Sequence, residues 1–282
     1  MKIKIKLIKQ CLGYLQRTSS SALTSRVRDI AYAIYRSANN PSYHMTINGE
    51  LRAIRIISKF FEGKTFFDVG ANVGQWSVLA AKSFERDGHV YSFEPCSRTY
   101  ESLLRNTNEM PSVKCFNVGL SNSTQSMDIF FSGKNPEKSS VEGYGVRSLN
   151  KKIEDYEAET QNFIRGDEFC ENNSIEEISF LKIDTEGHDF KVLEGFSGML
   201  KTGKIHAIQF EYNRLNIYAK VLLHDFYELL NPPSSPEAFR IGRIFPQSVR
   251  FKEYNPLDEN FIDGNFLAVR RAFGPLIDEI QN

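Results

Sequence analysis

The chain of 282 residues has few cysteines, no long apolar run and no net charge. Its four cysteines lie far apart, and none forms a C-x-x-C pair: Cys11, Cys96, Cys115 and Cys170. This spacing argues against a disulfide framework or a zinc cluster and is typical of free thiols in a reducing compartment. No apolar run approaches the roughly 18 residues of a membrane span. We therefore expect a cytoplasmic protein.

The absence of net charge gives no reason to expect a nucleic-acid partner, but the charge is unevenly distributed. Residues 1–40 contain eight basic side chains and one acidic side chain, Asp29, and so carry +7. Because the whole chain sums to zero, residues 41–282 carry −7. Lysines interrupt the apolar stretch near the start, which argues against a cleaved signal peptide. We assign residues 1–60 to a basic helical N-terminal extension and residues 61–282 to a second domain.

Two interpretations of residues 1–40 stay open. In the first, a basic amphipathic helix rests on an anionic membrane at its inner face. In the second, the segment is a helical cap on the domain, and its basic face is simply solvated. The second is favoured because Cys11, Leu12, Tyr14 and Leu15 also suit packing.

Short apolar runs alternate with helical patterns from residue 64 onward. The expected strands of this part are residues 65–69, 89–93, 113–118, 179–184 and 206–212. Such alternation predicts an α/β fold with a mostly parallel sheet and helices on both faces. No helical pattern separates residues 238–245 from residues 265–270, so we expect these two strands to pair antiparallel at one edge of the sheet.

Residues 133–152 have little periodicity. A loop of about 20 residues is uncommon inside a compact domain unless it is functional or disordered. We favour a flexible flap over the site, and a solvated insertion without function is the alternative.

The stretch FFDVGANVGQWS, residues 66–77, places a glycine-spaced turn directly after an apolar run. Ligands of open α/β sheets bind at the carboxyl ends of strands, and glycines there allow close approach to the backbone. The spacing from Gly70 to Gly74 departs from the dinucleotide pattern G-x-G-x-x-G, because Asn72 replaces its second glycine. Asp68 precedes the turn, and we expect its carboxylate to point into the crevice. A carboxylate there favours an ammonium or sulfonium group over a diphosphate.

Acidic residues also end the other expected strands. Glu94 ends the second strand, where an acid can accept hydrogen bonds from both ribose hydroxyls. Asp184, Glu186 and His188 crowd the end of the fourth strand in LKIDTEGHD, and such crowding is typical of active sites. Glu211 ends the fifth strand in QFEYN, as a site residue or as a structural partner for a basic side chain.

Five segments in this order resemble the FkbM-type family of S-adenosylmethionine-dependent O-methyltransferases: DVGANVGQWS, FEP, VGLSN, LKIDTEGHDFKVLEG and QFEYN. The resemblance covers roughly residues 60–230. It implies a class I, Rossmann-like methyltransferase fold with seven strands, five of them parallel, and a reversed edge hairpin. It also implies that Glu94 binds the cofactor's ribose and that Asn117 frames its adenine. The residues implied to hold the methionine part are Asp68, Gly70, Asn72 and Gly74.

The resemblance implies methylation of a hydroxyl on a sugar, a glycan or another small compound. We expect His188 and Asp184 to act as base and orienter, or as separate base and cofactor contact, because a hydroxyl benefits from general-base assistance. Glu186 and Glu211 are candidates for binding substrate hydroxyls or a divalent cation such as magnesium or calcium, although nothing demands a metal. A NAD-dependent oxidoreductase and a catalytically inactive binding module on the same scaffold stay as alternatives.

Overall fold

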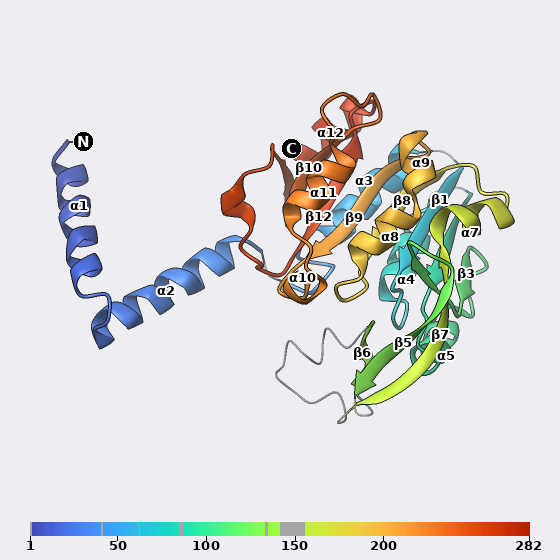
Figure 1. The fold of residues 1–282 in the computed structure, drawn as a ribbon. Helices are drawn as coiled ribbons and strands as arrows, with labels where there is room; N and C mark the ends of the chain where they lie inside the picture. Colours follow the sequence, from blue (N-terminus) through green and yellow to red (C-terminus); the bar gives the residue numbers. More distant parts are fainter. Residues whose placement is uncertain (1, 41, 62, 85–86, 133–134, 142–155) are drawn as a thin grey trace. The chain divides into compact units, whose positions relative to one another are not determined.

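The computed structural model describes residues 2–40, 42–61, 63–84, 87–132, 135–141 and 156–282 (Figure 1). Two compact units make up the chain, Met1–Pro41 and Ser42–Asn282. The boundary therefore lies nearer the N-terminus than the residue 60 that we expected. The helix α3, Glu50–Phe60, belongs to the second unit, where Ile54 and Ile57 are fully buried.

The first unit consists of two helices, α1 (Lys2–Arg17) and α2 (Ala22–Ala38). Ser21 caps α2, because its side chain accepts a hydrogen bond from the backbone of Thr24 at 3.2 Å. Four apolar side chains recur along α2 at spacings of four and three residues, and all are exposed: Leu23, Val27, Ile30 and Ile34. They share one helical face. Within the described part of the chain, no helix is long and apolar enough to cross a membrane.

The second unit is built on an eight-stranded sheet (Figure 1). In spatial order its strands are β11 (Ser248–Phe251), β10 (Phe239–Phe245), β12 (Gly264–Arg270), β9 (Ile205–Tyr212), β8 (Ile178–Ile183), β1 (Lys64–Val69), β2 (Gly88–Phe93) and β3 (Val113–Phe116). The last five run parallel, whereas β12 is antiparallel to β9 and β10 is antiparallel to β12. The predicted parallel sheet with an antiparallel edge pair is confirmed.

The sheet has one strand more than the seven that we predicted. The strand β11 lies between the two predicted edge strands, and it pairs antiparallel with β10 from Phe245 opposite Ser248 to Gly242 opposite Phe251. Only two residues connect these strands, which is the shortest common hairpin loop. The tight turn at Pro246 therefore leads directly into β11 and not into a longer loop.

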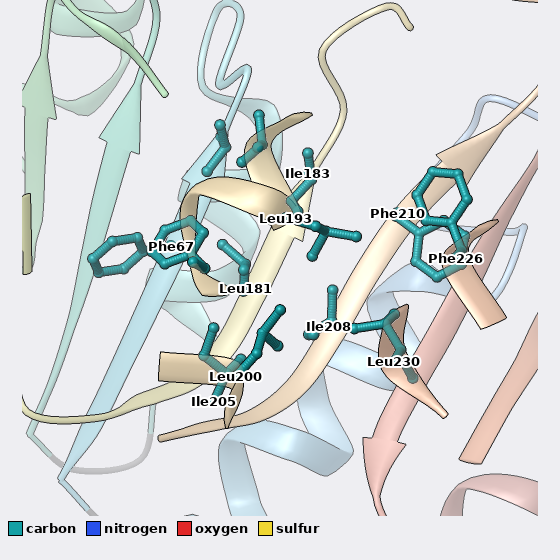
Figure 2. Close-up of a cluster of buried hydrophobic side chains, with 14 of the residues drawn as sticks. Phe67, Leu181, Ile183, Leu193, Leu200, Ile205, Ile208, Phe210, Phe226 and Leu230 are labelled. Atoms are coloured by element: carbon teal, nitrogen blue, oxygen red, sulfur yellow. The ribbon is translucent and has the colours of Figure 1, made fainter. Parts of the chain in front are cut away.

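Alternating side chains of the sheet face two different layers of helices. Phe66 and Phe180 pack with α3, α4 (Gln75–Lys82) and α12 (Gly274–Gln281). Their chain neighbours Phe67 and Leu181 face the opposite layer, which comprises α7 (Gly166–Asn172), α8 (Asp189–Gly195), α9 (Ser197–Lys201) and α11 (Leu223–Leu230). Figure 2 shows this second cluster, with side chains of β1, β8 and β9 against those of α8, α9 and α11. Successive side chains of a strand point to opposite faces of the sheet, and helices bury both faces of this parallel sheet.

The second unit has further helical elements. The helix α5 (Ser97–Thr107) connects β2 to β3, and a 3-10 turn spans Pro256–Asp258. Two helices follow β9, α10 (Leu215–Ala219) and α11. Lys220 between them has a φ of 58°, which is left-handed and ends the first helix.

A second sheet of four strands was not predicted. Its order is β4 (Gly119–Ser121), β7 (Glu157–Arg165), β5 (Gln125–Ser132) and β6 (Asn135–Val141). Of the flap that we expected at residues 133–152, residues 135–141 form β6, and the rest lies outside the described residues. The second sheet has its own small core, which contains Ile129, Val141 and Phe163.

Candidate functional site

A cavity of about 240 Å³ lies at the carboxyl ends of β1, β2 and β8. The turns that follow these strands form one wall, and the second sheet contributes Ile129, Ser140, Val141 and Phe163 to another. Met45 also lines the cavity. The cavity therefore lies where open α/β sheets bind their ligands, with an apolar cover from a separate sheet.

The glycine turn after β1 lies against the ends of both neighbouring strands. The backbone N–H groups of Gly70 and Ala71 both donate to the carbonyl oxygen of Phe93, at 3.0 and 2.9 Å. Gly70 has a φ of 74°, and a Cβ atom there would collide with the carbonyl oxygen of Asp184. Asn72 continues the turn with a φ of 52° and, like Gly70, lines the cavity. Glycine is thus required at position 70 by close packing of backbone on backbone.

Gly74 has a different place from the one we expected. It does not line the cavity but precedes α4 with a φ of 87°, and a Cβ atom there would meet the side chain of Leu103. Its role in the structure is to start the helix and to let α5 pack closely.

Glu94 fits its predicted place beside the glycine turn. It lines the cavity at the end of β2, and its two carboxylate oxygens accept the backbone N–H groups of Asn72 and Cys96, each at 2.9 Å. Its side chain is nonetheless buried, and burial raises its pKa to about 7. The carboxyl therefore ties the turns after β1 and β2 together and reaches the ligand space.

The expectation that Asp68 points into the crevice was wrong. Asp68 lies opposite Lys182 in the register of β1 and β8, is fully buried and does not line the cavity. Its Oδ1 lies 2.9 Å from the Nζ atom of Lys182, and Ser77 donates to its Oδ2 at 2.6 Å. Because a buried charge needs a partner, the carboxylate turns to the lysine rather than to the cavity. Its charge is compensated within the protein.

Lys182 is the site residue that sequence reasoning missed. It lines the cavity, and besides Asp68 it contacts the carbonyl oxygen of Gly70 at 3.1 Å and the carboxylate of Asp184 at 3.7 Å. The carboxylates of Asp68 and Asp184 raise its pKa despite the opposing effect of burial. The sequence did contain a signal for this ion pair. Lys182 interrupts the apolar run SFLKI, and Asp68 interrupts the apolar run FFDV.

Asn117 also differs from its predicted role. It is exposed and lies outside the cavity lining. Its amide donates to the carbonyl oxygens of Glu94 and Pro95 at 2.9 and 3.0 Å. Asn117 directly follows β3, and its side chain reaches the end of the neighbouring strand β2. It therefore stabilises the turn after β2 and does not enter the ligand space.

The structure brings together the three residues predicted after β8. Asp184, Glu186 and His188 all line the cavity, the first two partly exposed and the third buried. Glu186 has a φ of 54°, so the chain turns sharply there before α8 begins. The Nε2 atom of His188 lies 2.9 Å from the hydroxyl of Ser121 in β4, a contact that the sequence did not indicate. Ser121 thus orients the imidazole.

Glu211 lies beside this group but outside the cavity lining. Ile183 and Phe210 are paired in the register of β8 and β9, so Glu211, near the end of β9, lies level with Asp184, which directly follows β8. The Nδ2 atom of Asn213 donates to Glu211 at 2.6 Å. Burial raises its pKa, and the carboxylates of Asp184 and Glu186 raise it further. This donor is an amide, whereas we had considered a basic residue as its structural partner.

Asp189 connects the two strand ends. Its carboxylate accepts the backbone N–H and the hydroxyl of Thr185 at 3.3 and 2.9 Å, and the backbone N–H of Glu211 at 3.4 Å. Burial raises its pKa to about 6. It is a structural brace for the acidic end of the sheet.

Metal-ligand spacing occurs elsewhere in the described residues. His224, Asp225 and Glu228 place ligand atoms within 4.8 Å of one another on α11. This group does not include the carboxylates of the cavity, and no step of the function depends on it.

The strand order and the position of the cavity are those of a class I methyltransferase. The sequence matches the methyltransferase FkbM domain over residues 68–234, more than half of the chain. The chain therefore belongs to the FkbM methyltransferase domain family.

The relatives of this chain are distant. The hexuronic acid methyltransferase AglP of Haloferax volcanii is 29% identical over 158 residues, which cover 55% of this chain and 60% of AglP. A methyltransferase FkbM from Methylobacillus flagellatus has a TM-score of 0.45 and 13% identity, covering 75% of this chain and 45% of its own. A SAM-dependent O-methyltransferase from Thermotoga maritima has a TM-score of 0.41 and 12% identity, covering 78% of this chain and 64% of its own. Both structures are too distant to bear on function.

Proposed function

We propose that this protein is an S-adenosylmethionine-dependent O-methyltransferase that acts on a hydroxyl of a sugar, a glycan or a similar small compound. One observation carries the proposal. A single cavity joins the glycine turn and Glu94 on one side with Asp184, Glu186 and His188 on the other. A donor site and a group of acid–base residues thus share one space. The family and the named substrate class of AglP support the same conclusion.

The residues present fit the methyl donor. Glu94 reaches the cavity with a carboxylate suited to ribose hydroxyls. The backbone of Gly70 and Asn72 gives a close approach for the amino-acid part, and Phe93, Pro95 and Leu120 give apolar surface for the adenine. When bound, the cofactor supplies a methyl group that its sulfonium has already activated.

The acceptor hydroxyl needs a base and a dry environment. His188 is buried next to the cavity, and Ser121 holds its Nε2 atom. We assign His188 as the general base that takes the acceptor proton. The carboxylates of Asp184 and Glu186 accept hydrogen bonds from other hydroxyls of the acceptor. Ile129, Val141 and Phe163 cover the cavity and exclude water, which strengthens each of these interactions.

Calorimetry with S-adenosylhomocysteine and with NAD tests the donor. The proposal expects tight binding of S-adenosylhomocysteine and none of NAD. Binding of NAD alone would indicate an oxidoreductase, and binding of neither would indicate an inactive scaffold. Release of S-adenosylhomocysteine from S-adenosylmethionine in the presence of candidate glycosides then tests the acceptor class.

We further propose that the reaction takes place in the cytoplasm, with residues 1–40 resting on the inner face of an anionic membrane. The charge of +7 on residues 1–40 supports this placement.

A further inference from the structure

The charged groups that line the cavity are mostly acidic. Glu94, Asp184 and Glu186 contribute carboxylates, and Lys182 is the only lysine or arginine among the described residues of the lining. Lys182 is already committed, because its Nζ atom lies 2.9 Å from Asp68 and is buried with it. Negative charge therefore predominates at the cavity wall.

Further carboxylates stand behind the wall on the side of β9 and β12. Glu211 lies opposite Asn265 in the register of these strands, and Asp263 directly precedes β12. Both Glu211 and Asp263 are thus close to the ends of β8 and β9, where Asp184 and Asp189 lie. Burial is the largest cause of the raised pKa of Glu211. Four neighbouring carboxylates raise this pKa further: Asp184, Glu186, Asp189 and Asp263.

Two arginines, Arg214 and Arg243, lie outside the described lining of the cavity. Arg243 is buried, and its guanidinium donates to the carbonyl oxygens of Ile262 and Asp263 at 3.1 and 2.6 Å. Arg214 is exposed and outside the cavity lining. Lys182 is thus the one lysine or arginine side chain that the described lining contains.

From this arrangement we infer that the acceptor is a neutral sugar or an amino sugar and that a uronic acid is rejected. The inference rests on the proposed function and specifies its substrate class. Sugar hydroxyls donate hydrogen bonds to carboxylates, and an ammonium group gains a charge partner. A uronate carboxylate beside Asp184 and Glu186 instead meets like charges in a partly desolvated space, where repulsion is strong.

The inference separates this chain from its relative AglP, whose name gives a hexuronic acid as its substrate. The two sequences align over only 55% of this chain. Acceptor preference can therefore differ while the donor half stays the same.

Matched pairs of acceptors test the inference. Methyl glucoside is compared with methyl glucuronoside, and methyl galactoside with methyl galacturonoside, with methyl glucosaminide as the cationic member. Each pair differs in the charged group while the ring hydroxyls are kept. We expect kcat/KM for a neutral or amino member to exceed that for the uronate by at least about tenfold, which corresponds to about 1.4 kcal/mol.

A charge-removing variant tests the cause. Glu186→Gln is expected to raise the ratio of uronate to neutral kcat/KM by about tenfold, even if absolute rates fall, because the ratio cancels a general loss of activity. The matched control is Glu176→Gln. Glu176 is exposed and precedes β8, whereas Glu186 follows it, so the two lie at opposite ends of the same strand. The control is expected to leave the ratio unchanged.

Three results would overturn the inference. The first is a preference for a uronate, and the second is the absence of transfer to every neutral and amino member. The third is uronate transfer that appears only with added Mg²⁺, because the carboxylates would then form a metal site. Calorimetry with S-adenosylhomocysteine separates these from failure of the proposed function. Tight binding of that ligand beside any of the three overturns the acceptor class alone, whereas absence of binding overturns the methyltransferase itself.

Discussion

The Nζ atom of Lys182 lies 2.9 Å from Oδ1 of Asp68, and both side chains are buried between neighbouring parallel strands. This ion pair holds the ends of β1 and β8 in place beneath the cavity, because Lys182 also contacts the carbonyl oxygen of Gly70. The acid that we had assigned to the ligand thus stabilises the wall on which the ligand rests.

Replacing Lys182 by methionine is expected to lower the free energy of unfolding by about 3–5 kcal/mol, because it leaves the Asp68 carboxylate buried without its partner. Urea denaturation measures the change. Lys204→Met is the control, since Lys204 pairs with Glu177 at 3.1 Å on the surface and its loss should cost about 1 kcal/mol or less. Adding Asp68→Asn to Lys182→Met should restore part of the loss, and equal costs for Lys182→Met and Lys204→Met would contradict the structural role.

The glycine turn gives a second prediction. Gly70→Ala should abolish binding of S-adenosylhomocysteine and destabilise the fold, because the new Cβ atom would meet the carbonyl oxygen of Asp184 in a left-handed conformation. Gly63→Ala is matched to it, since Gly63 also has a positive φ, of 57°, but open space around its Cα. It should cost only about 1 kcal/mol and leave binding intact. Thermal unfolding and calorimetry on both variants give the comparison, and similar behaviour of the two would refute the packing argument.

Glu94 makes stability depend on pH. Its pKa is raised to about 7 in the folded protein from an ordinary value of 4.5, so between these values the folded state holds a proton that the unfolded chain has released. The contribution is fully present below about pH 4.5 and is lost as the pH rises through about 7, by roughly 3 kcal/mol. Asp189 acts in the same direction, so the quantity to measure is the difference between wild type and Glu94→Gln.

Urea denaturation from pH 4.5 to pH 8 should therefore show a smaller fall in stability for Glu94→Gln than for wild type, while Glu176→Gln follows wild type. The ionised carboxylate is also the better acceptor for ribose hydroxyls. Affinity for S-adenosylhomocysteine should accordingly rise between pH 6 and pH 8 in wild type and stay flat in Glu94→Gln. Parallel curves for the two proteins would contradict the assignment of Glu94.

His188→Ala tests the general base. We expect methyl transfer to fall by roughly 10²-fold in kcat with little change in affinity for S-adenosylhomocysteine, because the base acts on the acceptor rather than on the donor. His89→Ala is the control, as His89 is exposed at the opposite end of the sheet. Activity within about threefold of wild type in His188→Ala would exclude the role.

The membrane placement of residues 1–40 is tested by flotation with vesicles that contain anionic lipid. The full chain should float and a chain without residues 1–40 should not. Arg26→Glu combined with Arg28→Glu in the full chain should weaken flotation, because it reverses two positive charges on α2 and leaves its apolar face unchanged. Unchanged flotation of the shortened chain would rule out the membrane contact.

The parallel strands and several residues at their carboxyl ends could be predicted from the sequence. The runs at Phe66, Val90, Phe180 and Ile208 each carry an apolar side chain on both faces, which is a local property of the chain and identifies buried parallel strands. The glycine turn, Glu94 and the cluster from Asp184 to His188 follow directly from their places at strand ends.

Tertiary structure alone decided which charged groups face the ligand. Asp68 and Lys182 are 114 residues apart in the sequence, and only the register of β1 with β8 turns them toward each other. The contact of Ser121 with His188 depends on a second sheet whose strands pair across residues 119–165. Such long-range pairings depend on how distant segments pack, because a local pattern specifies burial but not the partner that a buried polar group will find.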